Sequence, residues 1–376
     1  MTPIETIEKN TVPTLFEDIT LNGMTLPNRF VRSATWEGLA APDGSVTEIL
    51  VDSMRALAEG HLGLIVSGHA FVSPEGRAGQ RQLSVGSDEF LPGLEKMALG
   101  VHESGGKIAL QLAHAGIRGA AGSEGFPAAG PSPLETESGV MGREMDEAEL
   151  EALVCAFAAA AARAQAAGFD AVQIHAAHGY LLSQFLSPFF NKRTDGYGGD
   201  LPGRARLPRE VVAAVRDAVG PGYPVLMKMN TEDFIPEGMT VEQMLQTVPI
   251  LEEAGLDSIE LSGGTFLSSP EERSMRVPRD PEAPPDPYYE EAAVGFKEKT
   301  RLPLMLVGGI RTYEIAERLV AEGIADYVAL SRPLICEPGL VRRWESGDLS
   351  ASTCRSGNRC FVRALKGRGL VCAYGR

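Results

Sequence analysis

The chain has 376 residues, 44% of them hydrophobic and 23% charged, and its formal net charge is −15. This composition is typical of a soluble globular protein. The sequence has no cluster of Lys and Arg, so its acidity argues against nucleic acid or an anionic membrane as a partner. The N-terminus lacks the apolar stretch of a signal peptide, and no segment approaches the ~18 apolar residues of a membrane span. We therefore expect a cytoplasmic protein with no membrane partner.

Eight short apolar segments, each with polar residues or glycine near its carboxyl end, define the organisation of the chain. They occupy residues 28–35, 62–69, 107–114, 170–178, 224–230, 257–264, 302–309 and 326–333. Helix-like segments lie between them, among them 147–168, 240–255 and 311–323. Strands buried on both faces that alternate with helices indicate a parallel sheet. Eight such units predict a single-domain α/β fold, the (β/α)8 TIM barrel. A doubly wound sheet is the alternative, but no glycine-rich nucleotide fingerprint follows the first strand.

Four segments depart from this regular pattern. Residues 14–27, with Asn22–Gly23 at their centre, predict a short hairpin that closes the bottom of the barrel. Two long connections, 115–146 after the third strand and 264–290 after the sixth, leave the carboxyl ends of their strands. Because long loops in compact domains are often functional, we expect both near the site. The last part of the chain, about 340–376, is expected to extend the barrel domain.

Polar residues or glycines follow the carboxyl ends of all eight predicted strands. In a barrel these ends converge on one mouth, where active sites are built. The residues are Ser33, Thr35, Ser67, Gly68, Gln111, His114, His175, His178, Lys228, Ser262, Gly263, Gly264, Gly308, Gly309, Ser331 and Arg332. We therefore expect one ligand site at this end of the barrel.

The last two strand ends indicate a phosphate site. Gly308–Gly309 leave backbone N–H groups unobstructed just before a helix, and Arg332 adds a fixed cation. Barrels commonly bind a phosphate after strands seven and eight. Gln111 offers a heterocycle both a donor and an acceptor, and Lys228 can stabilise negative charge on such a ring. These features fit flavin mononucleotide (FMN), and a sugar phosphate would satisfy them as well.

The chain resembles the Old Yellow Enzyme family of FMN-dependent oxidoreductases over nearly its whole length. The matching pieces are LPNRFVRSAT, IALQLAHAG, HAAHGYLLSQFLSPFFNKRTDGYGGDLPGRARLPREVV, MLVGGIRT and ALSRPLICEPGLV. The resemblance implies a barrel that binds FMN without a covalent bond and takes hydride from NADH or NADPH. It also implies reduction of the C=C bond of an activated alkene, such as an α,β-unsaturated carbonyl compound.

The resemblance further implies the roles of individual residues. The flavin ring would contact Ser33, Ala34, Thr35, Gly68, Gln111, Arg206 and Lys228. The phosphate would be held by Gly308, Gly309, Ser331 and Arg332. His175 and His178 would bind the carbonyl oxygen of the substrate, and Tyr180 would donate a proton to the α-carbon. This division is chemically reasonable, because negative charge grows on the carbonyl oxygen as hydride reaches the β-carbon.

Trp36 departs from the pattern of the family, where many relatives have Thr or Cys at this position. Gly38 stands where some relatives place an aromatic residue. We count Trp36 among the substrate-binding residues as a wall of the pocket, with simple filling of the core as the alternative.

Five cysteines form no disulfide framework, which fits a reducing compartment. Cys354, Cys360 and Cys372 are similar to the cysteines that hold a [4Fe–4S] cluster in the larger dienoyl-CoA reductases and trimethylamine dehydrogenase. Gly357 stands near the position of the missing fourth ligand. We interpret the three cysteines as a remnant and expect no metal.

The residues leave two alternatives to an alkene reductase. One is an oxidative amine dehydrogenase or demethylase of the trimethylamine dehydrogenase type. The other is a non-catalytic flavin-binding barrel. The expected partners are NAD(P)H and a small activated alkene; the sequence leaves a homo-oligomer open.

Overall fold

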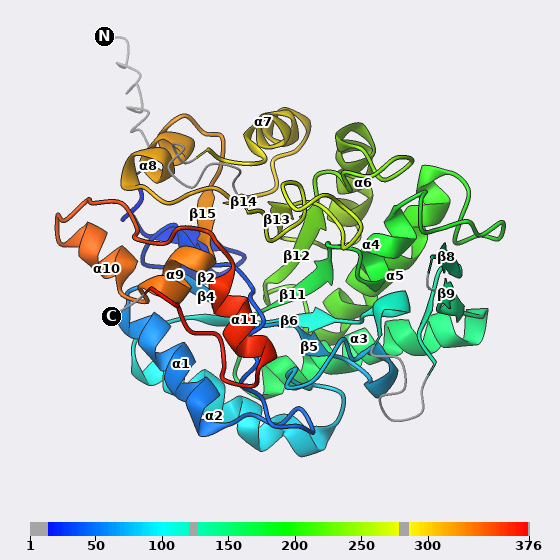
Figure 1. Ribbon diagram of the computed structural model, residues 1–376, viewed down its shortest axis with the longest axis horizontal. Coiled ribbons are helices and arrows are strands. Elements are labelled where there is room, and N and C mark those ends of the chain that lie inside the picture. The colour runs from blue at the N-terminus through cyan, green and yellow to red at the C-terminus, as the bar shows by residue number, and fades with distance from the viewer. Residues whose placement is uncertain (1–13, 120–126, 138, 278–285, 375–376) are drawn as a thin grey trace, which may run out of the picture.

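The computed structural model describes residues 14–119, 127–137, 139–277 and 286–374, and its centre is a closed barrel of eight parallel strands (Figure 1). The barrel strands are β3 (Phe30–Arg32), β4 (Leu64–Val66), β6 (Ile108–Ala113), β11 (Ala171–Ala176), β12 (Val225–Asn230), β13 (Ser258–Ser262), β14 (Leu304–Val307) and β15 (Tyr327–Leu330). The barrel closes where β15 pairs with β3, with Ala329 opposite Val31. The predicted (β/α)8 fold is confirmed, and each strand lies inside a predicted apolar segment.

Helices surround this barrel and join its strands (Figure 1). They are α1 (Glu48–Glu59), α2 (Leu91–Glu103), α3 (Glu147–Ala166), α4 (Leu181–Leu186), α5 (Leu201–Val219), α6 (Val241–Glu253), α7 (Glu290–Lys299), α8 (Tyr313–Ala321), α9 (Arg332–Cys336), α10 (Leu340–Glu345) and α11 (Arg359–Leu365). Two of the helices predicted from the sequence begin with a capping box, in which Asp146 pairs with Glu149 and Thr240 with Gln243. These local bonds satisfy free N–H groups of the first turn, so the helix starts are determined by the sequence itself.

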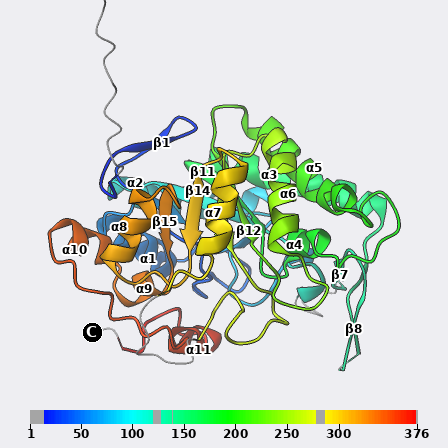
Figure 2. The same cartoon turned by 90° about the horizontal axis from the view of Figure 1, so that it is seen from above.

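The N-terminal hairpin closes the bottom of the barrel, as predicted. Strands β1 (Ile19–Leu21) and β2 (Met24–Leu26) pair around Asn22 and Gly23, which both have positive φ. That turn matches the twist of the two strands. Leu21 and Leu26 are buried in the apolar cluster inside the barrel. Figure 2 shows the hairpin and α11 on opposite sides of the barrel.

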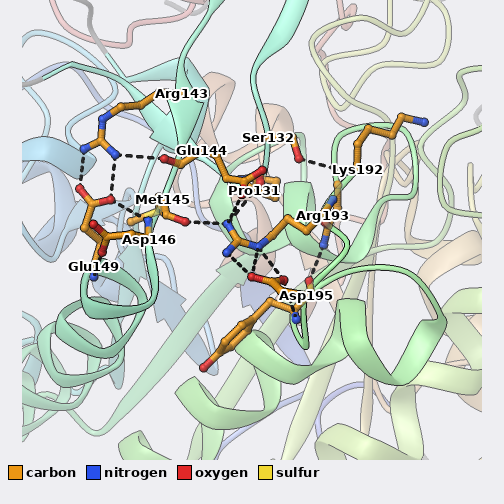
Figure 3. Close-up of polar contacts among 12 residues, drawn as sticks. Pro131, Ser132, Arg143, Glu144, Met145, Asp146, Glu149, Lys192, Arg193 and Asp195 are labelled. Carbon is orange, nitrogen blue, oxygen red and sulfur yellow. Dashed lines mark hydrogen bonds and ion pairs between the residues drawn. The ribbon is translucent and has the colours of Figure 1, made fainter.

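The long connection after β6 carries short strands of its own. They are β7 (Ala129–Gly130), β8 (Leu134–Thr136), β9 (Gly139–Met141) and β10 (Arg143–Glu144), and residues 120–126 and 138 lie outside the described part. Arg193 joins this connection to the segment before α5 (Figure 3). Its guanidinium donates to the Met145 carbonyl at 2.6 Å and forms an ion pair with Asp195 at 2.5 Å. The polar run at 191–195 therefore supports the loop.

The second long connection and the C-terminal extension meet above the strand ends. The side chain of Asn358 donates to the Met275 carbonyl at 2.7 Å, and Arg332 donates to the Arg276 carbonyl at 2.6 Å. Residues 278–285, which belong to the predicted loop 264–290, lie outside the described part. Among the described residues, no helix combines the length and hydropathy that crossing a bilayer requires. The predicted single domain, cytoplasmic location and homo-oligomer stay predictions.

Candidate active site

A cavity of about 600 Å³ opens at the carboxyl ends of the barrel strands. This volume is within the usual range of ligand and cofactor sites. The structure brings most of the predicted site residues into its lining: Ser33, Ala34, Thr35, Trp36, Gln111, His175, His178, Tyr180, Lys228, Gly308, Gly309, Ser331 and Arg332. Strand ends far apart in the sequence therefore form one site, as a barrel requires.

A layer of buried polar side chains lies beneath the cavity, and of this layer Ser33, Gln111 and Lys228 also line it. Gln111 on β6 donates to Gln173 on β11 at 2.7 Å, and Gln173 donates to Glu260 on β13 at 2.8 Å. Lys228 on β12 lies 3.1 Å from Glu260 and donates to the Ser33 hydroxyl at 2.7 Å. Burial lowers the pKa of Lys228, whereas the Glu260 carboxylate beside it acts in the opposite direction. The ammonium group is thus held by Glu260 on the neighbouring strand β13 and by Ser33, which follows the more distant strand β3.

His175, His178 and Tyr180 lie together on one wall of the cavity. The ring centroids of His175 and Tyr180 are 4.7 Å apart, and those of His175 and His178 are 5.3 Å apart. His175 follows Gln173 by two residues, so both side chains point into the barrel. Its Nδ1 atom is buried and has no hydrogen-bond partner. A buried nitrogen left unpaired has a free-energy cost, which a ligand oxygen could remove.

His178 reaches the cavity from a tight turn. Its φ is +64°, a conformation uncommon outside glycine, and Gly179 continues the turn with φ +72°. Asn230 accepts a hydrogen bond from the His178 backbone N–H at 3.0 Å, and Arg118 donates to the His178 carbonyl at 3.1 Å. The His178 Nε2 atom lies 2.8 Å from the Ser262 hydroxyl. Contacts from three other segments therefore hold this histidine.

Burial sets the protonation of the whole wall. It is the main cause that lowers the pKa of His175 and His178 well below the usual value, with charged and histidine neighbours adding to it. Burial also raises the pKa of Tyr180, while the nearby Arg118 cation acts to lower it. Near neutral pH the two imidazoles are therefore uncharged and the phenol keeps its proton. Uncharged imidazoles and a protonated phenol can all donate hydrogen bonds.

Two residues of this wall are absent from the sequence-based site. His69 lies 3.4 Å from the Tyr180 hydroxyl through its Nε2 atom, and burial lowers its pKa to about 4. The Arg118 guanidinium carbon lies 4.8 Å from the ring centroids of both Tyr180 and Phe266. His69 is the last residue of the second predicted segment, 62–69, so its position in the sequence was a usable signal. Arg118 comes from the long connection after β6, where no regular sequence pattern predicts the direction of a side chain.

The predicted phosphate site has a more complex geometry than the sequence suggests. Gly308 and Gly309 have φ of +107° and +78°, and a Cβ atom on Gly309 would lie 1.8 Å from the Asp286 carbonyl oxygen. The two glycines are therefore required by the close approach of the 286–289 segment as well. Arg332 uses one nitrogen to hold the carbonyls of Arg276 and Ser356, at 2.6 and 2.8 Å.

Two predicted cofactor residues are not among the residues that line the cavity. The Gly68 N–H donates to Glu37 at 3.0 Å, and a Cβ atom there would collide with the same carboxylate. Arg206 lies on α5, where its guanidinium pairs with Glu210 at 2.8 Å and stacks on the Tyr197 ring at 4.2 Å. The prediction that Arg206 contacts the flavin is corrected. Arg206 and Glu210 are one helical turn apart on α5, so the guanidinium points toward Glu210 and does not line the cavity.

Trp36 forms part of the cavity wall, and its indole N–H donates to the Arg81 carbonyl at 3.3 Å. On the same side, α11 contributes Phe361 and Leu365. The C-terminal extension therefore covers one side of the cavity with apolar side chains. Such a wall suits the flat ring of an organic ligand.

The charge of the cavity is opposite to that of the chain. Five cations line it, namely Arg81, Arg118, Lys228, Arg311 and Arg332, and no Asp or Glu does so among the described residues. A cleft lined by one sign of charge attracts ligands of the opposite charge. Besides His175, the buried Gln82 side chain leaves its Nε2 atom without a partner. The unpaired Gln82 donor and the cationic lining fit FMN, which carries a phosphate and a ring rich in acceptors.

Taken together, the barrel and its cation-lined cavity form a site of the (β/α)8 class that fits a flavin. The family model described as NADH:flavin oxidoreductase / NADH oxidase matches residues 14–349, and the chain belongs to this family. The resemblance to the Old Yellow Enzyme family is confirmed. The cofactor is FMN, bound without a covalent link, and NADH is the reductant in the description of the family.

Relatives differ in length and in the reactions that their names describe. The NADH oxidase of Thermoanaerobacter brockii is 36% identical over 338 residues, which cover 89% of this chain and 51% of that protein. The chain thus spans about half the length of that relative. The 4,4'-dithiodibutanoate disulfide reductase of Rhodococcus erythropolis is 34% identical over 385 residues, covering 96% of this chain and 95% of the relative. The solved structure of the old yellow enzyme homologue from Zymomonas mobilis has a TM-score of 0.77 and 26% identity, covering 92% of this chain and 96% of the homologue.

Proposed function

We propose that the chain takes hydride from NAD(P)H through FMN and reduces the C=C bond of an α,β-unsaturated carbonyl compound. The observation that carries this proposal is the wall formed by His175, His178 and Tyr180. Two uncharged imidazoles and a protonated phenol meet there within 4.7–5.3 Å between adjacent rings. Alkene reduction needs a clamp for a carbonyl oxygen and a donor for one proton, and these three side chains can supply both.

His175 and His178 act as the carbonyl clamp in this proposal. The Nδ1 atom of His175 is the unpaired nitrogen of the wall. If the Ser262 hydroxyl donates its hydrogen bond to Nε2 of His178, the proton of the uncharged imidazole is on Nδ1. The Nδ1–H group is then free to donate to the carbonyl oxygen of the substrate. Both donors stabilise negative charge as it develops on the oxygen, in the manner of an oxyanion hole.

Tyr180 is the proton donor. Its raised pKa keeps the hydroxyl protonated at neutral pH, and Arg118 beside its ring stabilises the phenolate that remains after proton transfer. His69, at 3.4 Å from the hydroxyl, orients it.

FMN supplies the two-electron chemistry when it is bound. Ser33, Ala34 and Thr35 line the cavity and would contact its ring, and Gln111 and Lys228 would meet its polar edge. Gly308, Gly309, Ser331 and Arg332 would hold the phosphate. Trp36 forms a wall of the substrate pocket.

An amine dehydrogenase is a weaker candidate. Substrates of that class are cationic near neutral pH, and five cations with no described carboxylate line this cavity. A non-catalytic barrel leaves the convergence of His175, His178 and Tyr180 without a purpose.

The two half-reactions test the proposal. NADH or NADPH should bleach the flavin of the purified protein, and an enone such as cyclohexenone should restore its colour. In Tyr180→Phe we expect reoxidation by the enone to slow by roughly 10²–10⁴-fold, while reduction by NAD(P)H stays nearly unchanged. Tyr197→Phe removes a hydroxyl outside the cavity and serves as the matched control. An enone that fails to reoxidise the reduced protein, or equal rates in Tyr180→Phe and wild type, would contradict the proposal.

A further inference from the structure

A pair of thiols lies close together at the C-terminal end of the fold. The Sγ atom of Cys372 is 3.3 Å from the Sγ atom of Cys336, and all five cysteines of the chain are free. Cys336 ends helix α9, and Cys372 follows α11 in the C-terminal segment. Cys336 was not part of the set of three cysteines that the sequence singled out. The fold therefore pairs Cys372 with a residue from outside that set.

The environment of the two thiols differs. Burial, together with the neighbouring Cys372 and Cys354 thiols, raises the pKa of Cys336 to about 11, and the Thr353 hydroxyl lies 3.3 Å from its sulfur. Cys372 lies on a more accessible segment, because Val371 and Tyr374 beside it are 48% and 47% exposed. Both thiols are themselves partly exposed, and the exposed neighbours of Cys372 make it the thiol that we assign to the first attack.

The pair lies next to the cofactor cavity. Helix α9 begins at Arg332, which lines the cavity, and ends at Cys336. Arg332 also donates to the Ser356 carbonyl at 2.8 Å and to the Asn358 side chain at 3.0 Å. Helix α11, which follows directly, lines the cavity with Phe361 and Leu365. The chain between the two cysteines thus includes the segment that covers one side of the cavity.

We propose that Cys336 and Cys372 form a reversible disulfide that fixes this covering segment over the cofactor cavity. The oxidant is a low-molecular-weight disulfide. The Cys372 thiolate attacks it, forms a mixed disulfide and releases one small thiol. Cys336 then loses its proton to solvent, attacks the Cys372 sulfur and releases the second small thiol. Two cysteine thiols are oxidised and one small disulfide is reduced to two thiols, so electrons and protons balance.

The disulfide closes a loop that contains α11, and this restricts opening of the cover. The second step should be the slower one near neutral pH, because the raised pKa of Cys336 keeps its sulfur protonated. Its rate should rise with pH up to about that pKa. Release of FMN should slow by about tenfold after oxidation, equivalent to about 1.4 kcal/mol of opening free energy.

The test uses the full-length protein with FMN bound. Incubation with oxidised glutathione should remove the mass of two hydrogens, and peptide mapping should find Cys336 joined to Cys372. Reduction should restore the mass and the faster release of FMN. Cys372→Ser should form no internal disulfide and show no oxidant effect on FMN release. Cys155→Ser removes an exposed thiol on α3 and should behave like the wild type.

Several results would overturn the proposal. One is a different pairing, such as Cys354 with Cys360; another is no disulfide at any ratio of oxidised to reduced glutathione. Stoichiometric iron or zinc that shields these thiols in anaerobically purified protein would also overturn it. If the Cys336–Cys372 disulfide forms and the rate of FMN release stays unchanged, the disulfide does not fix the segment with α11 over the cavity. Enone reduction by reduced protein does not enter these readouts, so the proposed function stands or falls separately.

Discussion

The two ends of the barrel are built from the same eight strands but have opposite characters. At the bottom, Leu21, Met24 and Leu26 of the hairpin fill the interior, and the packing is apolar. At the mouth, a hydrogen-bonded polar layer that includes Gln173 and Glu260 underlies the cavity. This difference teaches that one end supplies stability and the other supplies chemistry, which is the usual division in barrels. Substitutions at the two ends should therefore separate the two properties.

The largest effect is expected at the bottom. Leu26 is fully buried, so Leu26→Ala should lower the free energy of unfolding by about 2–5 kcal/mol through lost burial and a residual cavity. Both half-reactions should keep their rates at 25 °C. Chemical denaturation and stopped-flow absorbance measure these quantities. Thr20→Ala, an exposed change on the same hairpin, should stay within about 0.5 kcal/mol. A loss of enone reduction in folded Leu26→Ala protein would contradict the division between a stabilising bottom and a catalytic mouth of the barrel.

A substitution at the mouth should slow catalysis more than it lowers the free energy of unfolding. His175→Ala removes a proposed donor to the carbonyl oxygen, so we expect reoxidation by an enone to slow by roughly 10²–10³-fold. Reduction by NAD(P)H should be affected much less. His61→Ala, which removes the partner of Glu345 and does not touch the cavity lining, is the control. Equal rates in the two variants would remove His175 from the clamp.

Acid should lower the free energy of unfolding through the buried histidines near the mouth of the barrel. Burial lowers the pKa of His69 and of His114 to about 4, whereas an unfolded histidine titrates near 6.5. Below pH 6.5 the unfolded chain takes up protons that the folded chain does not bind. Their stabilising contribution is thus complete above pH 6.5 and is lost as the pH falls to about 4, on the order of 3 kcal/mol for each residue. Denaturation between pH 4 and 7 measures the loss, which should be smaller in His69→Gln.

The smallest effects concern Arg206 and Arg332, which the sequence analysis both assigned to the FMN site. Arg332→Gln should weaken FMN binding by roughly 10- to 100-fold, because charged hydrogen bonds contribute about 1.5–3 kcal/mol. Arg206→Gln should leave FMN affinity within about twofold, since its guanidinium pairs with Glu210 on α5. Fluorescence titration of the flavin compares the two. Similar losses in both variants would restore Arg206 to the cofactor site.

Much of the fold was predictable because its signals are local. Capping boxes at Asp146 and Thr240 mark helix starts, and Asn22–Gly23 marks the hairpin turn. The apolar segments identify strands buried on both faces. From the number of strands and the barrel rule, most predicted residues at the strand ends could be placed at one mouth, as found.

The errors and omissions have a common cause, which is that side-chain direction outside the strands is set by distant contacts. Arg206 lies in a matched motif, yet helix α5 turns it toward Glu210 and Tyr197. Arg118 reaches Tyr180 from a connection without a fixed period. Cys336 meets Cys372 across 36 positions of sequence. No local pattern encodes such pairs.

The sequence by itself determined the barrel, the hairpin, the family and the polar strand ends, because hydrophobic period and turn chemistry act over a few residues. Only the tertiary structure decided which side chains share the cavity and what charge surrounds them. It placed five cations around the mouth of a chain whose net charge is −15. It also buried the histidines deeply enough to keep them neutral. Burial and long-range proximity arise from the packing of the whole chain, and they determine the chemistry of this site.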